Sequence, residues 1–228
     1  MKKYFISVGV MLALFFVPIL MIIGFFTVDT TNDSGFNPQN EQERVAQKVA
    51  SYVTSHEGTI EFAAAWLGNL EHESGLIPSR IQGDKLYNEA LAFNSSVGGY
   101  AFALGQWDSE RRVNLLTLAK TTNKDWKTVE FQMDYAWNHD GADSTLLKNM
   151  SKSKDVEKLA VDILKLWERA GTKDDPIEQI GRKTSAMNWY KRLTTGNGSA
   201  NIGGGKIDVI EAILGQTING GQCYGLTA

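Results

Sequence analysis

Glu71 and Glu73 are the pair of residues whose type and spacing best suit acid–base chemistry. They stand near the end of an apolar helical stretch that runs into a Ser-Gly turn. A helical projection at about 100° per residue places Glu73 between Phe62 and Trp66. A carboxyl beside an apolar aromatic surface holds its proton more tightly, as a general acid must. The same spacing also fits two solvated glutamates at a helix end, so the pattern alone leaves both interpretations open.

The stretch around Glu73 also carries a family resemblance. The sequence Trp66-Leu-Gly-Asn-Leu-Glu-His-Glu73-Ser-Gly-Leu-Ile-Pro78 resembles the glutamate-serine motif of lysozyme-like enzymes, especially the phage tail lysozyme family. In that family the glutamate directly before the serine is the catalytic acid and stands at the end of a helix. The resemblance therefore gives this role to Glu73 and not to Glu71.

Three further matches follow in the order of the family. Residues 103–112, Ala-Leu-Gly-Gln-Trp-Asp-Ser-Glu-Arg-Arg, are similar to the Gly-Leu-x-Gln block that lines the sugar cleft of lytic transglycosylases, and to the Gly-x-x-Gln-Trp block of the phage enzymes. The other two are residues 132–137, Gln-Met-Asp-Tyr-Ala-Trp, and residues 167–171, Trp-Glu-Arg-Ala-Gly. The resemblance thus spans about residues 45 to 193.

This resemblance implies a peptidoglycan hydrolase that cuts glycan strands. As a muramidase, it would cleave the β-1,4 bond between N-acetylmuramic acid and N-acetylglucosamine, with Glu73 protonating the leaving oxygen. A second carboxylate would lie about 5–5.5 Å away for retention, or about 6.5–9.5 Å away for inversion. Without one, the sugar's own hydroxyl can close a 1,6-anhydro ring, as in lytic transglycosylases. A non-catalytic wall-binding component of an envelope-spanning secretion or conjugation machine is a third interpretation.

Four residues are candidates for the second carboxylate: Asp84, Asp108, Glu110 and Asp134. We expect Asp108, because it directly follows the cleft-type Gln106-Trp107 pair. Asp108 is also a natural N-cap for the helix that follows, which is the competing interpretation. His139 and Asp140 stand where the family pattern has a Glu-Leu pair, so that stretch is a poor place for a catalytic carboxylate.

Aromatic and amide side chains could bind the sugar. The resemblance implies that Gln106 contacts the N-acetyl groups. Candidates for stacking on sugar rings are Trp66, Tyr100, Trp107 and Tyr135. The remaining tryptophans of the helical pattern, Trp126, Trp137 and Trp167, fit a core better.

Apolar residues that recur at helical spacing predict the elements that position these groups. The expected helices cover 41–55, 59–73, 109–121, 126–139, 155–170 and 177–193. Asn40 and Thr59 are suitable N-caps, Gly171 is expected to end the fifth helix, and Pro176 suits the start of the last. Residues 76–103 show no helical stripe and form a loop or a small hairpin. We therefore expect a mainly α, lysozyme-like domain at 41–193 with an irregular or small β insert.

The amino-terminal residues predict a membrane anchor. Residues 4–28 carry no charge and are long enough to span a bilayer as a helix, with Lys2 and Lys3 before them. This pattern predicts a single-pass transmembrane anchor at 1–28, a linker at 29–40, and a domain on the extracellular, cell-wall side. A cleaved signal peptide is the alternative, although its apolar region normally spans only about 7–15 residues.

The carboxyl-terminal residues suggest a second module. A Gly-, Ser- and Asn-rich linker at 194–206 precedes residues 207–228, which include Cys223 in Gly-Gln-Cys-Tyr-Gly-Leu-Thr-Ala. This segment resembles the opening of CHAP domains, in which the cysteine is the nucleophile. Such an enzyme needs a histidine base, and all three histidines precede the linker. We therefore expect the start of a truncated CHAP-like domain that is inactive in this chain.

The architecture and composition restrict the partners. Anchored lysozyme-plus-CHAP proteins resemble the wall-opening components of Gram-positive conjugation systems, which implies type IV secretion or conjugation partners besides peptidoglycan and membrane. The net charge of −3 over 228 residues gives no basic footprint for nucleic acid. A single cysteine excludes an internal disulfide. The histidines lack the His-x-x-x-His spacing of a zinc site, so no metal is expected. No cofactor is expected.

Overall fold

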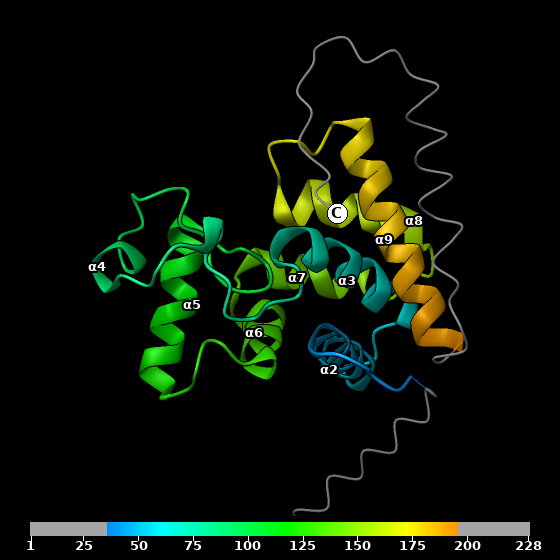
Figure 1. The fold of residues 1–228 in the computed structure, drawn as a ribbon, viewed down its shortest axis with the longest axis horizontal. Helices are drawn as coiled ribbons and strands as arrows, with labels where there is room; N and C mark the ends of the chain where they lie inside the picture. The colour runs from blue at the N-terminus through cyan, green and yellow to red at the C-terminus, as the bar shows by residue number, and fades with distance from the viewer. Residues whose placement is uncertain (1–35, 196–228) are drawn as a thin grey trace, which may run out of the picture. The chain divides into compact units, whose positions relative to one another are not determined.

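The computed structural model describes residues 36–195, and most of them are helical (Figure 1). The α-helices are α2 (Glu41–Ser55), α3 (Ile60–Ser74), α4 (Glu89–Ala92), α5 (Ser109–Thr122), α6 (Val129–Asp134), α7 (Ala142–Met150), α8 (Val156–Asp162) and α9 (Pro176–Thr195). A 3-10 turn, η1 (Gln82–Asp84), lies in the insert. Two π-helical segments, η2 (Tyr135–His139) and η3 (Ile163–Glu168), continue α6 and α8. The prediction of a mainly helical domain is confirmed.

Local sequence signals set several helix ends. The side chains of Asn40 and Thr59 accept hydrogen bonds from the first turns of α2 and α3, as expected of N-caps. Gly75 ends α3 in the left-handed conformation that glycine adopts without strain. The helical segment of α8 and η3 ends at Arg169, which takes a left-handed conformation itself. The prediction that Gly171 ends this helix is therefore wrong by two residues.

Two other stretches differ from the pattern-based expectation. The helix expected at 126–139 begins at Val129, because residues 125–128 form a turn before it. Helices α7 and α4 were not predicted. Apart from η1 and α4, the insert at 76–103 has isolated β-bridges in place of a hairpin, and these pair Phe102 with Ile81 and with Trp107.

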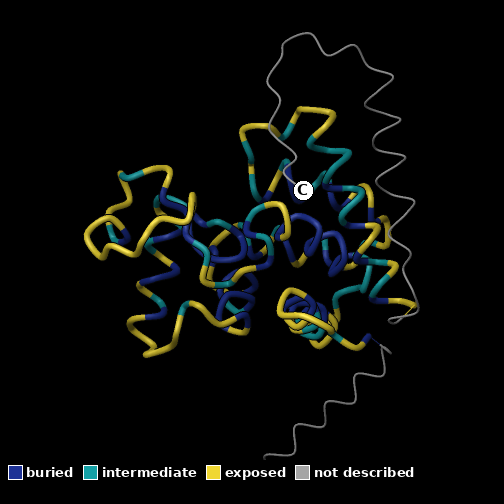
Figure 2. Tube along the Cα trace, viewed as in Figure 1, coloured by how far each residue is buried: buried dark blue, intermediate teal, exposed yellow. Residues whose placement is uncertain are grey.

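Helix α3 is the central element of the described residues. Every residue from Phe62 to Leu70 is buried, and the helix packs against α2, α8 and α9 (Figure 2). The approach to α9 is close at Gly68, where a Cβ would lie 2.5 Å from the backbone nitrogen of Ala186. Only glycine permits this contact. The close approach brings the end of α3 against the first half of α9.

Arg112 in α5 organises the irregular insert. Its side chain is fully buried, and its only counter-charge in the described contacts is Asp108, at 2.6 Å. It also donates to the backbone carbonyls of Ala92, Asn94, Val97 and Tyr100. One guanidinium with five donors thus replaces the hydrogen-bond ladder that a sheet would provide.

The predicted ends of the chain lie outside the described residues. This applies to the anchor at 1–28, most of the linker at 29–40, and the tail with Cys223. Between residues 36 and 195, no helix is both long and apolar enough to cross a membrane.

Candidate active site

Glu73 lies in the last turn of α3, where the buried helix reaches the surface. Its side chain is 22% exposed, and its Oε1 accepts a hydrogen bond of 2.7 Å from Nη2 of Arg182 in α9. The helical projection placed Phe62 and Trp66 beside this carboxyl, whereas the structure gives it a guanidinium partner. A charge-assisted hydrogen bond of this kind fixes the orientation of the carboxylate.

Three glutamates from different elements converge on Arg182, whose side chain is only 4% exposed. Its Nη2 binds Glu73, its Nε donates to Glu178 at 2.7 Å, and its Nη1 lies 3.2 Å from Oε2 of Glu168. Nη1 also donates to the Asn69 carbonyl at 2.8 Å, which ties the arginine to α3. We call Arg182, Glu73, Glu168 and Glu178 the Arg182 cluster.

Glu168 is the most buried carboxyl of this cluster, with 3% of its side chain exposed. Burial, and then the negative charge of Glu73, raise the pKa of Glu168 well above its ordinary value of 4.5. Arg182 opposes this shift, but its single charge is divided among three carboxyls. The buried member of this carboxyl pair therefore favours its protonated form.

Small residues at the contact of α3 with α9 allow the cluster to form. Gly68 permits the close approach described above, and Gly181 lies beside the His72 ring, where a Cβ would stand 3.0 Å from Cε1. Arg182 follows Gly181 directly and lies four residues after Glu178, which puts both charged side chains on one face of α9.

The residues beside Glu73 in the sequence have other partners. Glu71 is exposed, and its Oε2 accepts a hydrogen bond of 3.1 Å from Trp189 Nε1. His72 Nε2 lies 3.1 Å from the Ser185 hydroxyl. Burial, and then the charge of Arg182, lower the pKa of His72. The side chains of Glu71 and Glu73 thus enter different surroundings although they are two residues apart.

Asp108 is committed to structural contacts. It is the N-cap of α5, and its Oδ1 accepts from Ser109 N at 2.7 Å and from Arg112 Nη1 at 2.6 Å. Its Oδ2 accepts from Gly99 N at 2.9 Å. Both oxygens are therefore occupied in holding the insert, as the competing N-cap interpretation expected, and this geometry does not support a second catalytic carboxylate at Asp108.

All four of the rings predicted to stack on sugar are in the core instead. Tyr100, Trp107 and Tyr135 are 2% exposed or less, and so is Trp66. The Trp107 ring turns inward against Trp167, with its Nε1 donating to Asp140 at 3.1 Å. The Tyr135 and Tyr100 hydroxyls donate to backbone carbonyls. Rings buried in this way have no face available to a sugar. The prediction that they stack on sugar rings is therefore wrong, and they belong to the core.

Gln106 is the predicted sugar contact that stays partly exposed. It adopts a positive φ of 44°, and Ala103 three residues earlier has a φ of 70°. Left-handed conformations are costly for residues other than glycine and often occur at binding sites. This turn directs Trp107 into the core and leaves Gln106 at the surface, where its Nε2 donates to the Ala103 carbonyl.

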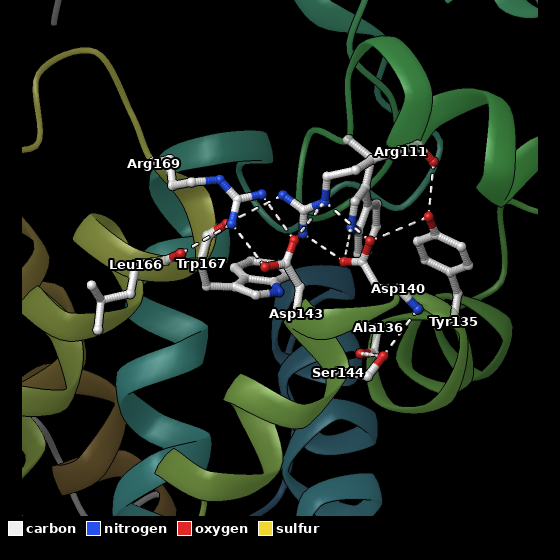
Figure 3. A network of polar contacts seen from close by, with 10 residues as sticks. Arg111, Tyr135, Ala136, Asp140, Asp143, Ser144, Leu166, Trp167 and Arg169 are labelled. Carbon is white, nitrogen blue, oxygen red and sulfur yellow. Dashed lines mark hydrogen bonds and ion pairs between the residues drawn. The ribbon is translucent and has the colours of Figure 1, made fainter.

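A second set of charged residues stabilises the end of η3 (Figure 3). Asp140 accepts from Arg111 Nε at 3.1 Å, and Asp143 accepts from Arg169 Nη1 and Nη2 at 2.8 Å each. Arg111 also lies over the Trp167 ring, 5.1 Å from its centroid. We call Arg111, Arg169, Asp140 and Asp143 the Arg111 network. It pairs two cations with two anions and fixes the residues on both sides of Glu168.

The described surface holds a shallow hollow of about 270 Å³ on α5 and η2. Its lining residues are Asn114, Thr117, Leu118, Thr121, Tyr135 and His139. None belongs to the Arg182 cluster. Among residues 36–195, no three His, Cys, Asp or Glu side chains are grouped as a metal ion would require.

The sequence predicted a role for Glu73 but none for its partners Glu168 and Arg182. Glu168 follows Trp167 in the last of the matched motifs, yet the pattern gave it no role. Glutamate is almost never fully buried unless it is paired, so the sequence before Glu168 gave no usable sign of its burial. For Arg182 the signal is its four-residue spacing from Glu178, which is weak.

The fold and the site define a lysozyme-like helical domain with a carboxyl pair at the end of its central helix. Residues 44–193 match the family described as phage tail lysozyme. Because this match covers more than half of the chain, the chain belongs to the phage tail lysozyme family. It is thus a lysozyme-like peptidoglycan hydrolase.

Proposed function

We propose that the protein cleaves the β-1,4 bond between N-acetylmuramic acid and N-acetylglucosamine, with Glu73 as the general acid. One observation carries the choice of residue. Glu73 is partly exposed and held by Arg182 against the buried Glu168, whereas Glu71 is bonded to Trp189 and lacks such a partner. A titratable pair of this kind, at the end of a buried helix, is typical of an acid–base site.

The reaction follows from these positions. The Glu73 carboxyl gives its proton to the glycosidic oxygen as the bond to the anomeric carbon breaks. Water then adds to the sugar, and its proton returns to the Glu73 carboxylate. Glu168 is too deeply buried to meet the substrate directly.

A second candidate product is the 1,6-anhydro sugar of a lytic transglycosylase. The occupied oxygens of Asp108 favour it, because hydrolysis in the usual form needs a second carboxylate across the sugar. The first candidate is supported by the family, whose members are lysozymes. Product mass separates the two, since an anhydro end is lighter by one water than a reducing end.

The decisive experiment compares the full-length protein with Glu73→Gln on purified peptidoglycan. Release of soluble glycan by the wild type, its loss in Glu73→Gln, and wall binding by both support the enzyme. Glu71→Gln is the matched control, since it removes the same charge two residues away. Wall binding without any product from the wild type supports instead a non-catalytic component of an envelope-spanning machine.

We further propose that residues 1–28 anchor the protein in the cell membrane, with the lysozyme-like domain on the wall side and secretion or conjugation components as partners. The uncharged run after Lys2 and Lys3 supports this location. The full-length protein should fractionate with membranes. Detection of a mature form that begins near Asp29 in the medium would contradict an uncleaved anchor.

A further inference from the structure

Glu168 is a buried carboxyl beside Glu73, the proposed acid. The proton transfer proposed above involves Glu73 and gives Glu168 no role. It comes from η3, and Arg182 Nη1 lies 3.3 Å from its Oε1 and 3.2 Å from its Oε2. Within residues 36–195, its Oε2 has no hydrogen-bond donor in good geometry. An oxygen in this position is suited to carry a proton and to donate it to a neighbouring carboxylate.

The charges around Glu168 come from two helices. α3 contributes Glu73, and α9 contributes Glu178 and Arg182. His72 of α3 faces Glu178, with its Nδ1 3.7 Å from Oε1. If all three carboxyls were ionised, Arg182 would face three negative charges, two of them less than a quarter exposed. Anions crowded in a poorly solvated site repel one another, so one proton is retained by the group.

We propose that Glu73 and Glu168 share one proton, with Glu168 as the positioning residue that holds it and Arg182 as the common counter-ion. This inference rests on the proposed function. The proton passes from Glu168 to Glu73 and then to the glycosidic oxygen as that bond breaks. The attacking water or sugar hydroxyl returns one proton to the pair, so none is consumed over a cycle.

The alternative is that Glu168 only neutralises the buried Arg182. A residue with that role affects folding and lowers activity equally at every pH. A shared proton has a different signature, because the anionic neighbour is what keeps the proton on the pair as pH rises. The pH at which activity is lost on the alkaline side therefore distinguishes the two roles.

The test uses full-length Glu168→Gln and the pH profile of kcat/KM on purified peptidoglycan. Glutamine keeps the shape and can still donate to Glu73, but it removes the second ionisable group. We expect the alkaline limb to move to lower pH by one unit or more. Glu178→Gln is the control, because that carboxyl is also bound to Arg182 but is 27% exposed. It should move the limb much less. An unmoved limb in Glu168→Gln overturns the proposal.

Thermal unfolding against pH provides a readout that needs no catalysis. The pKa of Glu168 is raised in the folded state, so folding binds a proton above the ordinary value of 4.5. The wild type therefore loses stability as pH rises from 4.5 through the raised pKa. Glu168→Gln lacks this loss, and its Tm minus that of the wild type should increase with pH. If the Tm curves of the wild type and Glu168→Gln run parallel with pH, the proposal that Glu73 and Glu168 share a proton is rejected. Diverging curves in a protein that cleaves nothing leave the pair standing and reject the proposed function.

Discussion

The Arg182 cluster and the Arg111 network meet at Glu168, the last residue of η3, and Arg169, which directly follows it, yet they differ in charge balance. The Arg111 network sets two arginines against two aspartates. Although burial acts in the opposite direction, hydrogen bonding by Arg169 and the charge of Arg111 lower the pKa of Asp143. In the Arg182 cluster one arginine faces three glutamates, and the pKa of Glu168 is raised.

This difference separates a scaffold from a site. A balanced network needs no proton and is satisfied at any pH near neutrality, so it stabilises the fold. An unbalanced one retains a proton that can be transferred, at a cost in stability, which is a pattern found at functional sites. The comparison predicts that substitutions in the Arg182 cluster mainly lower activity, whereas substitutions in the Arg111 network mainly lower stability.

The largest effect is expected on activity from Glu73→Gln. Removing a general acid typically costs about 100- to 10,000-fold in rate. Because the change also relieves the excess negative charge on Arg182, Tm should be unchanged or slightly higher. Glycan release and thermal unfolding of the same preparation measure both quantities. A large fall in Tm would mean that Glu73 belongs to the scaffold.

The next largest effect is expected on stability, from a substitution in the Arg111 network. Asp140→Asn removes the charge of a side chain that is 2% exposed and leaves Arg111 and Trp107 with a poorer acceptor. We expect a loss of about 3 kcal/mol in the free energy of unfolding, or roughly 6–12 °C in Tm. Below the new Tm, kcat should stay close to wild type.

Asp84→Asn is the matched control for Asp140→Asn. Asp84 pairs with Arg80 at the surface, with 76% of its side chain exposed, and asparagine tolerates its positive φ of 53°. The expected change is below about 0.5 kcal/mol. Equal losses in the two variants would show that the buried pairing in the Arg111 network has no special weight.

The sequence predicts the helices of this fold better than its site. Period-3.6 apolar stripes predict α2, α3, α5 and α9 to within a few residues, because each stripe is a local property. The prediction that Glu73 is the acid likewise comes from a local motif. Arg182, however, is 109 residues away from it, and their contact depends on how α3 packs against α9. No periodicity within one helix contains that information.

Trp107 is a residue for which the local sequence gave a wrong prediction. Its place beside Gln106 predicted a cleft residue, but the left-handed turn at Ala103 and Gln106 directs its ring inward. Neither residue is a glycine, so the sequence gives no sign of this conformation. Burial of a side chain in an irregular loop depends on partners such as Asp140, which lie elsewhere in the chain.

A smaller effect should follow from Gly68→Ala, which tests the packing that assembles the Arg182 cluster. The added Cβ would lie 2.5 Å from Ala186 N, so α3 and α9 must move apart. We expect a loss of about 1–3 kcal/mol in stability and a fall in activity, since Arg182 is displaced from Glu73. Gly171→Ala has open space around its Cβ and is the control. Full activity in a folded Gly68→Ala variant would contradict the need for close helix packing.

The smallest effect is expected from Glu71→Gln, and it tests the choice of carboxylate most directly. Glu71 is exposed, and its contact is one hydrogen bond from Trp189 Nε1, which a glutamine Oε1 can still accept. Activity should therefore stay within about threefold of wild type, and stability within about 1 kcal/mol, the usual value of one hydrogen bond. The two glutamates are close in sequence, carry the same charge and end the same helix, so non-specific electrostatic effects on the anionic wall should be alike. If Glu71→Gln is inactive and Glu73→Gln is active, with both folded, the Arg182 cluster is a structural feature and the acid is Glu71.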